Sequence, residues 1–443
     1  VDRELGALTG YLAGKYNVSA KFEAVPPAIL AIARVPHANW DSAQTQQMET
    51  FFSEQVYFTA DPKVGKLTRR EEELGAIVAS ATKSVPTTMV MLQQEKATPA
   101  YVLMRGDFQN PGEQVTPDVP ALFPPMAEGQ PRNRLGLARW MSDPRHPLVS
   151  RVAVNRYWKQ LFGVGLVKTL GDLGTQGDRP SHPRLLDWLA VEFIESGWNI
   201  KQLQKRMLLS ATYRQSARHT GRFETIDPEN RFLSRASRFR LSAEEIRDNA
   251  LAISGLLSEK IGGPSVKPYQ PADYYADKIG RGWDQSRGED LYRRGLYTYW
   301  RRTTVYPTFQ IFDAPSREFC TVNRPRTNTP LQALVLLNDP TFVEAARVFG
   351  QRIMLAGGAT LAEKLSYAFE HAVARSPSAA ERQALAEIWQ QQKTLYQQEK
   401  TAAAQLVGQG ASVKPENLDT VEHAAWTALA SVLLNLDETI TRE

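Results

Sequence analysis

The sequence contains a single cysteine, Cys320, among its 443 residues. One cysteine excludes an internal disulfide, a zinc site made of four thiolates and the C-x-x-C-H attachment of c-type haem. The six histidines are scattered, and no pair has the i, i+4 spacing by which two histidines on one helix face bind a metal. We therefore expect no dedicated metal centre and no cofactor in this chain, while a calcium site built from carboxylates stays open.

Long apolar runs are also absent, because no segment approaches the roughly 18 consecutive apolar residues that span a bilayer. Positive charge is barely in excess, since 53 Lys and Arg stand against 48 Asp and Glu, a net charge of +5. We expect no membrane span and no nucleic-acid partner. The chain opens on VDRELGALTG, without an initiator methionine or a basic-then-apolar signal segment, which favours a processed chain or the C-terminal part of a longer one.

Helical periodicity is what the sequence has in abundance. Apolar residues recur at spacings of three and four in segment after segment, and capping residues such as Ser181, Asn199, Ser242 and Asp339 precede several of them. The main helical segments are 134–143, 146–163, 181–198, 199–217, 240–263, 339–357, 378–405 and 418–439. The pattern predicts a mainly α protein, a multi-helix domain with a small β element and long ordered loops.

Changes in composition along the chain predict three parts. Residues 1–85 form an N-terminal helical subdomain, with helices at 25–34, 41–58 and 67–83. Residues 86–131 hold a short β-prone pair followed by a proline-rich connector, and residues 132–443 form the C-terminal helical domain. The β-prone runs are 87–92 and 100–105, which we expect to pair, and a further strand is expected at 295–303.

The stretch CTVNRPRTNTPLQALVLLNDPTF, residues 320–342, suggests an anion site. Asn328 or Thr329 can cap a helix that begins at Pro330, and the apolar run LQALVLL predicts that this helix is buried. A helix N-terminus attracts anions, and arginines can hold a carboxylate, sulfate or phosphate with two hydrogen bonds. The candidate ligand-binding residues here are Arg317, Arg324, Arg326 and Asn328.

Plainer interpretations of the same stretch stay open. The arginines can instead pair with internal acids such as Asp313, Glu318 or Asp339 and fix the loop. Cys320 as a nucleophile needs a stabilised thiolate and a general base, and no pattern identifies a histidine partner. A lone cysteine is more often a small buried apolar side chain.

The glycine-rich loop 163–183 is a second candidate, because so long a loop inside a helical domain is more often functional than idle. Its residues Asp172, Asp178 and His182 could bind a sugar or act as acid and base. The loop lacks the Gly-x-Gly-x-x-Gly and Walker patterns of nucleotide sites. The alternative is an ordered loop whose polar residues cap helices.

Rings and arginines alternate between Trp283 and Trp300, and Arg281 lies just before them. Such a surface suits a polyanionic sugar, a redox partner or, least in view of the weak overall charge, single-stranded nucleic acid. An aromatic-rich strand packed on helices explains the rings equally well.

Three longer stretches, 134–167, 175–217 and 312–347, carry a resemblance to a known family. With phrases such as EKIGGPSVKPYQP and RTNTPLQAL, they resemble the C-terminal domain of unknown function in planctomycete-type cytochrome c proteins, from about Thr87 to the C-terminus. The resemblance implies a large exported protein, periplasmic or at the cell surface. It also implies that a c-type haem domain and a second uncharacterised domain precede this one, so that the haem would lie on an upstream domain.

Together these observations favour a non-haem accessory domain of an exported cytochrome c-linked protein. It would bind an anionic or polysaccharide ligand, or a redox partner such as the cytochrome c domain of the same or a neighbouring polypeptide. The alternative is an enzyme, either a haem-coupled oxidoreductase or a hydrolase acting on carbohydrate, that uses the Asp, His and Arg loops. A purely structural scaffold is the third interpretation.

Overall fold

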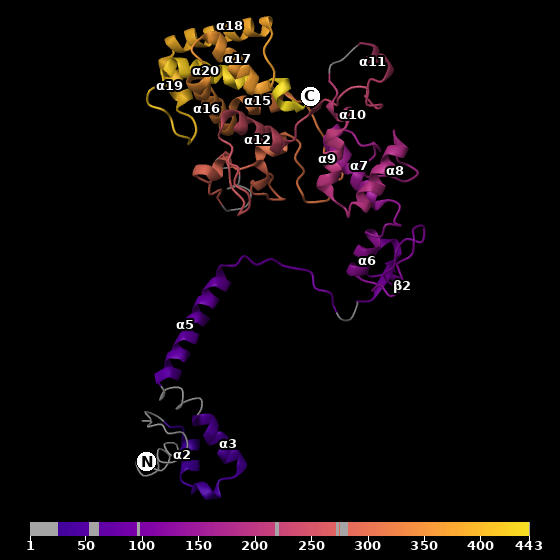
Figure 1. Ribbon diagram of the computed structural model, residues 1–443, viewed down its shortest axis with the longest axis vertical. Helices are drawn as coiled ribbons and strands as arrows, with labels where there is room; N and C mark the ends of the chain where they lie inside the picture. The colour runs from indigo at the N-terminus through magenta and orange to yellow at the C-terminus, as the bar shows by residue number, and fades with distance from the viewer. Residues whose placement is uncertain are drawn as a thin grey trace. The chain divides into compact units, whose positions relative to one another are not determined.

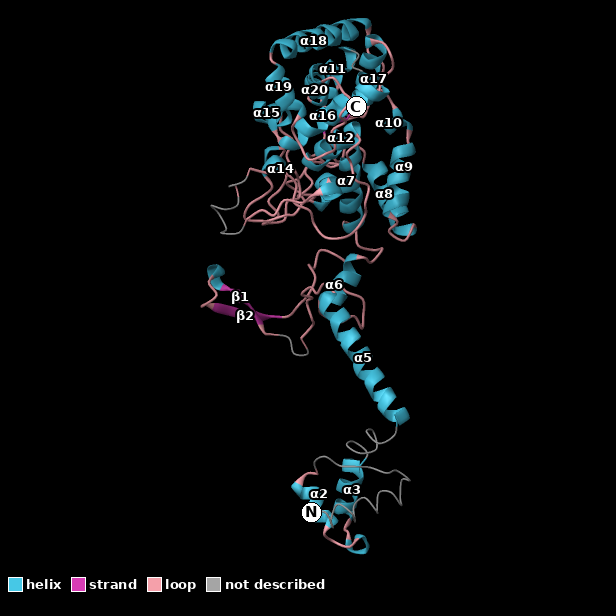
Figure 2. Ribbon diagram, turned by 90° about the vertical axis from the view of Figure 1, so that its left-hand side faces the viewer, coloured by secondary structure: helices cyan, strands magenta, loops and turns pink. Residues whose placement is uncertain are grey.

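The computed structural model describes residues 25–52, 62–94, 98–217, 221–271, 274 and 282–442. The chain forms two compact units, Val1–Ala100 and Tyr101–Glu443 (Figure 1). Helices dominate the described residues, whose strands form only two small two-stranded sheets (Figure 2). The prediction of a mainly α fold with a small β element is therefore confirmed. No described helix is long and apolar enough to cross a membrane.

The N-terminal unit contains a small helical cluster and one longer helix, α5 (Pro62–Ser84). Helix α2 (Pro27–Ala33) begins at a proline, and α3 (Ser42–Phe51) is capped by the Asp41 carboxylate. The helix expected at 41–58 is thus present in its first part, while residues 53–58 lie outside the described residues. The buried apolar side chains of this cluster are Ile29, Ile32, Met48, Phe51 and Phe52.

The first sheet differs from the expected pairing. Strand β1 (Ala100–Leu103) pairs with β2 (Pro111–Val115), whereas residues 87–92 form no strand and are exposed. The connection includes the 3-10 helix η3 (Met104–Gly106), and an Asp107-centred turn reverses the chain. Residues 105–110 therefore form the turn of a local hairpin. The strand propensity of the runs 87–92 and 100–105 did not indicate this turn.

In the larger unit, a first group of helices packs around a single apolar core. Asn199 caps its helix as expected, since its side chain accepts from the backbone N–H of Gln202. Ser181 does not cap, because its hydroxyl donates to the Leu166 carbonyl and His182 takes the N-cap position. Three helices build this core, α7 (Val149–Phe162), α8 (Pro183–Glu195) and α9 (Ile200–Leu209), and α10 (Ala211–Arg214) packs on it through Tyr213. The helices α6 (Arg134–Met141) and α11 (Gly221–Ile226) belong to the same part of the chain but contribute no described residue to the core. The core is built from Val154, Trp158, Phe162, Leu166, Leu186, Leu189, Phe193, Leu203 and Met207.

A second group of helices forms a bundle around α16 and α20. Its caps follow the sequence closely: Ser242 and Glu245 form a capping box, and Asp339 accepts from the backbone N–H of Thr341. The helices are α12 (Ala243–Ser254), α14 (Pro307–Ile311), α15 (Pro330–Asn338), α16 (Pro340–Ala356), α17 (Leu361–Val373), α18 (Ala379–Gln398), α19 (Lys400–Val407), α20 (Thr420–Leu434) and α21 (Asp437–Ile440). Figure 1 shows α16 and α20 within this group, and their buried Phe342, Phe349, Trp426, Leu429 and Leu433 form its centre.

Two expected elements of this region differ in the structure. Helix α12 ends at Ser254, where Gly255 adopts a left-handed conformation with φ 85°, rather than continuing to Gly262 and Gly263. The strand expected at 295–303 is replaced by a 3-10 turn, η5 (Gly295–Tyr297), and a single β-bridge from Thr298 to Val266. A second 3-10 turn, η4 (Gly288–Tyr292), precedes it.

Helix α15 is only half-buried, which corrects the expectation of a fully buried helix. Gln332 and Leu336 are buried, but Leu331, Leu334 and Leu337 are 51%, 55% and 44% exposed. The helix packs against α14, α16 and α20 through one face only. Apolar composition alone therefore did not determine which face is covered.

The second sheet brings the end of the described chain beside residues two hundred positions earlier. Strand β3 (Phe239–Arg240) pairs antiparallel with β4 (Thr441–Arg442), with Phe239 opposite Arg442. The Arg442 guanidinium also donates to the Leu161 carbonyl near the end of α7 at 2.9 Å. These contacts fix Phe239 and Arg240 next to α7.

Candidate functional site

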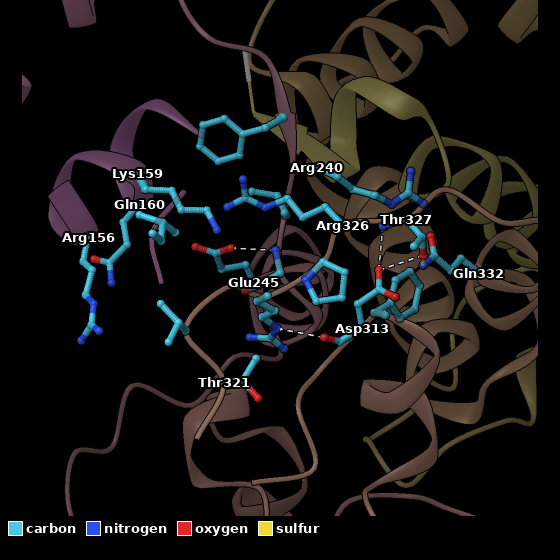
Figure 3. A pocket seen from close by; sticks show the side chains of 18 of the residues that line it. Arg156, Lys159, Gln160, Arg240, Glu245, Asp313, Thr321, Arg326, Thr327 and Gln332 are labelled. Carbon is cyan, nitrogen blue, oxygen red and sulfur yellow. Dashed lines mark hydrogen bonds between the residues drawn. The ribbon is translucent and has the colours of Figure 1, made fainter. Parts of the chain in front are cut away.

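A cavity of about 590 Å³ lies among α7, β3 with the start of α12, and the loop 312–327. Five cationic side chains and two carboxylates line this basic cavity, so its local charge favours anions. Figure 3 shows Lys159 and Arg326 extending toward one another from opposite sides. The cations are Arg156, Lys159, Arg240, Arg324 and Arg326, and the carboxylates are Glu245 and Asp313.

Arg326 is a partly buried cation of this cavity that has no described carboxylate as a partner. Its guanidinium lies over the Phe239 ring, 4.4 Å from the ring centroid, and donates weakly to the Gly163 carbonyl at 3.5 Å. Among the described residues no carboxylate forms an ion pair with it. Burial lowers the pKa of Arg326, and the more distant Glu245 only partly opposes this shift.

Lys159 adds a second charge that is poorly compensated. Its ammonium donates to the side-chain oxygen of Asn323 in the loop 312–327. Burial lowers the pKa of Lys159, and the positive charge of Arg326 lowers it further. Two neighbouring cations that burial already disfavours are stabilised when an anion binds between them.

Arg324, by contrast, is held internally. Its guanidinium forms a 2.8 Å ion pair with Glu244 at the start of α12 and donates to the Asp313 carbonyl at 3.2 Å. The Asp313 carboxylate accepts from the Thr327 backbone N–H and hydroxyl at 2.7 and 2.8 Å. The interpretation in which arginines fix the loop therefore holds for Arg324 and does not hold for Arg326.

The other residues singled out in this stretch lie outside the cavity, except Cys320. Arg317 is exposed and stacks on the Trp300 ring, with its guanidinium carbon 4.0 Å from the ring centroid. Asn328 is exposed, and α15 has no side-chain cap from Thr329 at its N-cap position. Cys320 is exposed and lines the basic cavity, so it is not the buried packing residue of the plainer interpretation. Among the described histidines, none lines the cavity beside it.

A second cavity, of about 600 Å³, lies between the end of α7, the glycine-rich loop and residues 228–239. Asp178 lines it, but Asp172 and His182 do not. The Asp172 carboxylate accepts from the Gly174 N–H at 2.8 Å and shapes the loop, and His182 contacts Ser181 at 3.0 Å. In this fully described part of the chain, the three candidate acid–base residues do not meet in one cavity.

The aromatic stretch from Trp283 to Trp300 does not form an exposed patch. Tyr292 is buried, and Trp283 and Trp300 are half-buried against the bundle core. Arg293 is buried between the Tyr297 ring and backbone carbonyls that include that of Pro264. Arg281 lies outside the described residues.

Sequence reasoning missed three of the five described cations that line the basic cavity. Arg156 and Lys159 come from the exposed side of α7, and Phe239 and Arg240 come from β3, which is only two residues long. None of them stands in a motif, and only the fold places them beside Arg326. Among the described residues no group of three or more His, Cys, Asp or Glu side chains could hold a metal ion.

Comparison with known proteins gives one match. No curated protein and no solved structure matches the chain. The model of the PSD1 family, described as a protein of unknown function (DUF1553), matches residues 133–389, which is more than half of the 443 residues. The matched region includes α7, β3 and the loop 312–327, and therefore most of the wall of the basic cavity. The chain belongs to the PSD1 family of proteins of unknown function (DUF1553).

Proposed function

We propose that the chain is a non-haem ligand-binding domain whose basic cavity binds the acidic groups of a polysaccharide. The observation that carries the proposal is the pair Lys159 and Arg326, two partly buried cations that face one cavity without an ion pair to a described carboxylate. A sulfate or carboxylate between them would form charge-assisted hydrogen bonds to both and would offset the cost of their burial.

The setting of this binding is part of the same proposal. The resemblance to the C-terminal domain of planctomycete-type cytochrome c proteins supports an exported, periplasmic or cell-surface location. In that setting the c-type haem belongs to another domain, and the present chain contributes carbohydrate recognition to an electron-transfer protein. The half-buried rings of 283–300 do not favour this stretch as the docking surface for the cytochrome domain.

In the basic cavity, binding is favoured over hydrolysis by the roles of its two carboxylates. Hydrolysis of a glycosidic bond normally requires two carboxyl groups placed on either side of the bond. In the basic cavity Asp313 is engaged by Thr327, and one Glu245 oxygen accepts from the Ser242 backbone N–H at the start of α12. These carboxylates have structural roles, whereas the cations face the opening.

The proposal is tested by calorimetric titration with a heparin-derived disaccharide at low salt. Arg326→Ala and Lys159→Ala should each weaken binding about 10- to 100-fold, because a hydrogen bond to a charged group contributes about 1.5–3 kcal/mol. Arg184→Ala, an exposed residue of α8 that lines neither cavity, is the matched control and should bind like the original chain. If the original chain, Arg326→Ala, Lys159→Ala and Arg184→Ala all bind the disaccharide with equal affinity, the proposal is refuted.

A further inference from the structure

The basic cavity and the second cavity meet at two residues, Phe239 and Arg326, which line both. Two guanidinium groups lie over the Phe239 ring. The guanidinium carbon of Arg326 lies 4.4 Å from the ring centroid, and that of Arg442 lies 5.4 Å from it. Gly163, with φ 79°, leaves room for this ring, since an added Cβ would lie 2.8 Å from it. The boundary between the cavities is thus a ring with a cation on its face.

The second cavity also has more cations than acids. Lys168 is paired with Glu229 at 3.0 Å, and the buried Arg235 donates to the carbonyls of residues 227 and 228. Arg238 is paired with Asp437. Two exposed arginines remain without an ion pair to any described residue, namely Arg179 and Arg231. The second cavity therefore has its own cations available for an anionic group.

We infer that the two cavities are adjacent subsites for one extended acidic oligosaccharide, with Arg326 at the junction. This inference rests on the proposed function and adds to it the length of the ligand and a second set of contacts. One acidic group lies between Lys159 and Arg326, and a following group of the same chain lies near Arg179 and Arg231. Linking two weak contacts in one ligand raises the affinity, because the second contact forms at a high effective concentration.

A saccharide fits this surface better than a single-stranded nucleic acid. Proteins that bind single strands offer open aromatic faces on which bases stack. Here the Phe239 ring is covered by Arg326 and Arg442, and the other lining rings, Phe312, Trp158 and Phe162, are buried. The cations are therefore the accessible groups, and no ring is free to stack on a base.

The test is a length series of heparin-derived oligosaccharides titrated into the full chain. We expect the hexasaccharide to bind at least about tenfold more tightly than the disaccharide. The double substitution Arg179→Ala and Arg231→Ala should abolish this gain in affinity, whereas Arg326→Ala should weaken binding at every length. Both loop arginines are exposed, so their replacement should preserve folding, which circular dichroism checks. Arg184→Ala should retain the gain.

The outcomes separate this inference from the proposed function. If no fragment binds, the proposed function itself fails and the inference falls with it. If disaccharide and hexasaccharide bind equally, or the double variant keeps the full gain, the basic cavity acts alone and the inference is overturned. Tighter binding of a thymidine hexanucleotide than of the hexasaccharide would overturn the choice of ligand class.

Discussion

Lys159 shows how a single partly buried cation can make ligand binding depend on pH. Its folded-state pKa is lowered below the ordinary 10.5, first by burial and then by Arg326. The protonated side chain is therefore disfavoured in the folded protein. This cost is present below the lowered pKa and is relieved as pH rises from that pKa toward 10.5, so the contribution of Lys159 to stability increases across this window.

Affinity for the heparin disaccharide should change in the opposite direction. Binding needs the charged ammonium, so affinity should fall as pH rises through the lowered pKa of Lys159, before an ordinary lysine titrates. Removing Arg326 should raise this pKa. NMR titration of the labelled lysine side chain in the original chain and in Arg326→Ala measures both pKa values, and identical values would contradict the coupling.

Glu344 and Arg347 on α16 form a buried polar network that no sequence pattern indicated. Both are fully buried, and the Glu344 carboxylate accepts from the Tyr292 hydroxyl and from the backbone N–H of Ser412. Glu344→Ala should destabilise the larger unit by about 3–5 kcal/mol, because it leaves Arg347 buried without its counter-charge. Urea unfolding measures this loss. A double variant with Arg347→Met should recover part of the stability, and no recovery would argue against the uncompensated charge as the cause.

Helices α16 and α20 approach each other so closely that α16 requires a glycine, Gly350, at the contact. A Cβ on Gly350 would lie 2.9 Å from the Thr427 nitrogen and 3.0 Å from the Trp426 carbonyl carbon. Alanine gains about 1 kcal/mol of helix propensity over glycine, but overpacking costs about 1–3 kcal/mol. Gly350→Ala should therefore lower the melting temperature of the larger unit. Gly75→Ala in α5, where nothing lies within 4 Å of the added atom, should not lower stability.

Elements that depend on local chemistry could be predicted from the sequence, and those that depend on distant contacts could not. The capping residues Asn199, Ser242 and Asp339 act within one turn, so their positions fixed the helix starts correctly. The predicted partner of β1 and the predicted full burial of α15 were wrong, because turn geometry decides the first and tertiary packing decides the second. For the site, Arg324 and Arg326 could be found from their place beside a helix start. Lys159 could not, since only the tertiary fold brings it to the cavity.

In the whole molecule, the segment 86–94 lies between α5 and β1, before the start of the larger unit at Tyr101, and it is exposed throughout. Brief digestion with thermolysin, which cleaves before bulky apolar residues, should cut first between Met89 and Leu92. The C-terminal product should remain folded and bind the disaccharide as the full chain does. Mass spectrometry of the first products tests this, and it also tests the predicted boundary at 85. A first cut within 101–217 would contradict it.

The pairing of β3 with β4 has a consequence for the synthesis of the protein. The wall of the basic cavity needs Phe239, and that ring is held by Arg442, two hundred residues later in the chain. A nascent chain that ends before Arg442 can already pack α7 against α8 and α9, because these contacts are local. It cannot complete the recognition surface. Capture on an immobilised acidic glycan should therefore discriminate full-length protein from prematurely terminated products, and ribosome-stalled chains of graded length would show binding arise only once Arg442 has emerged.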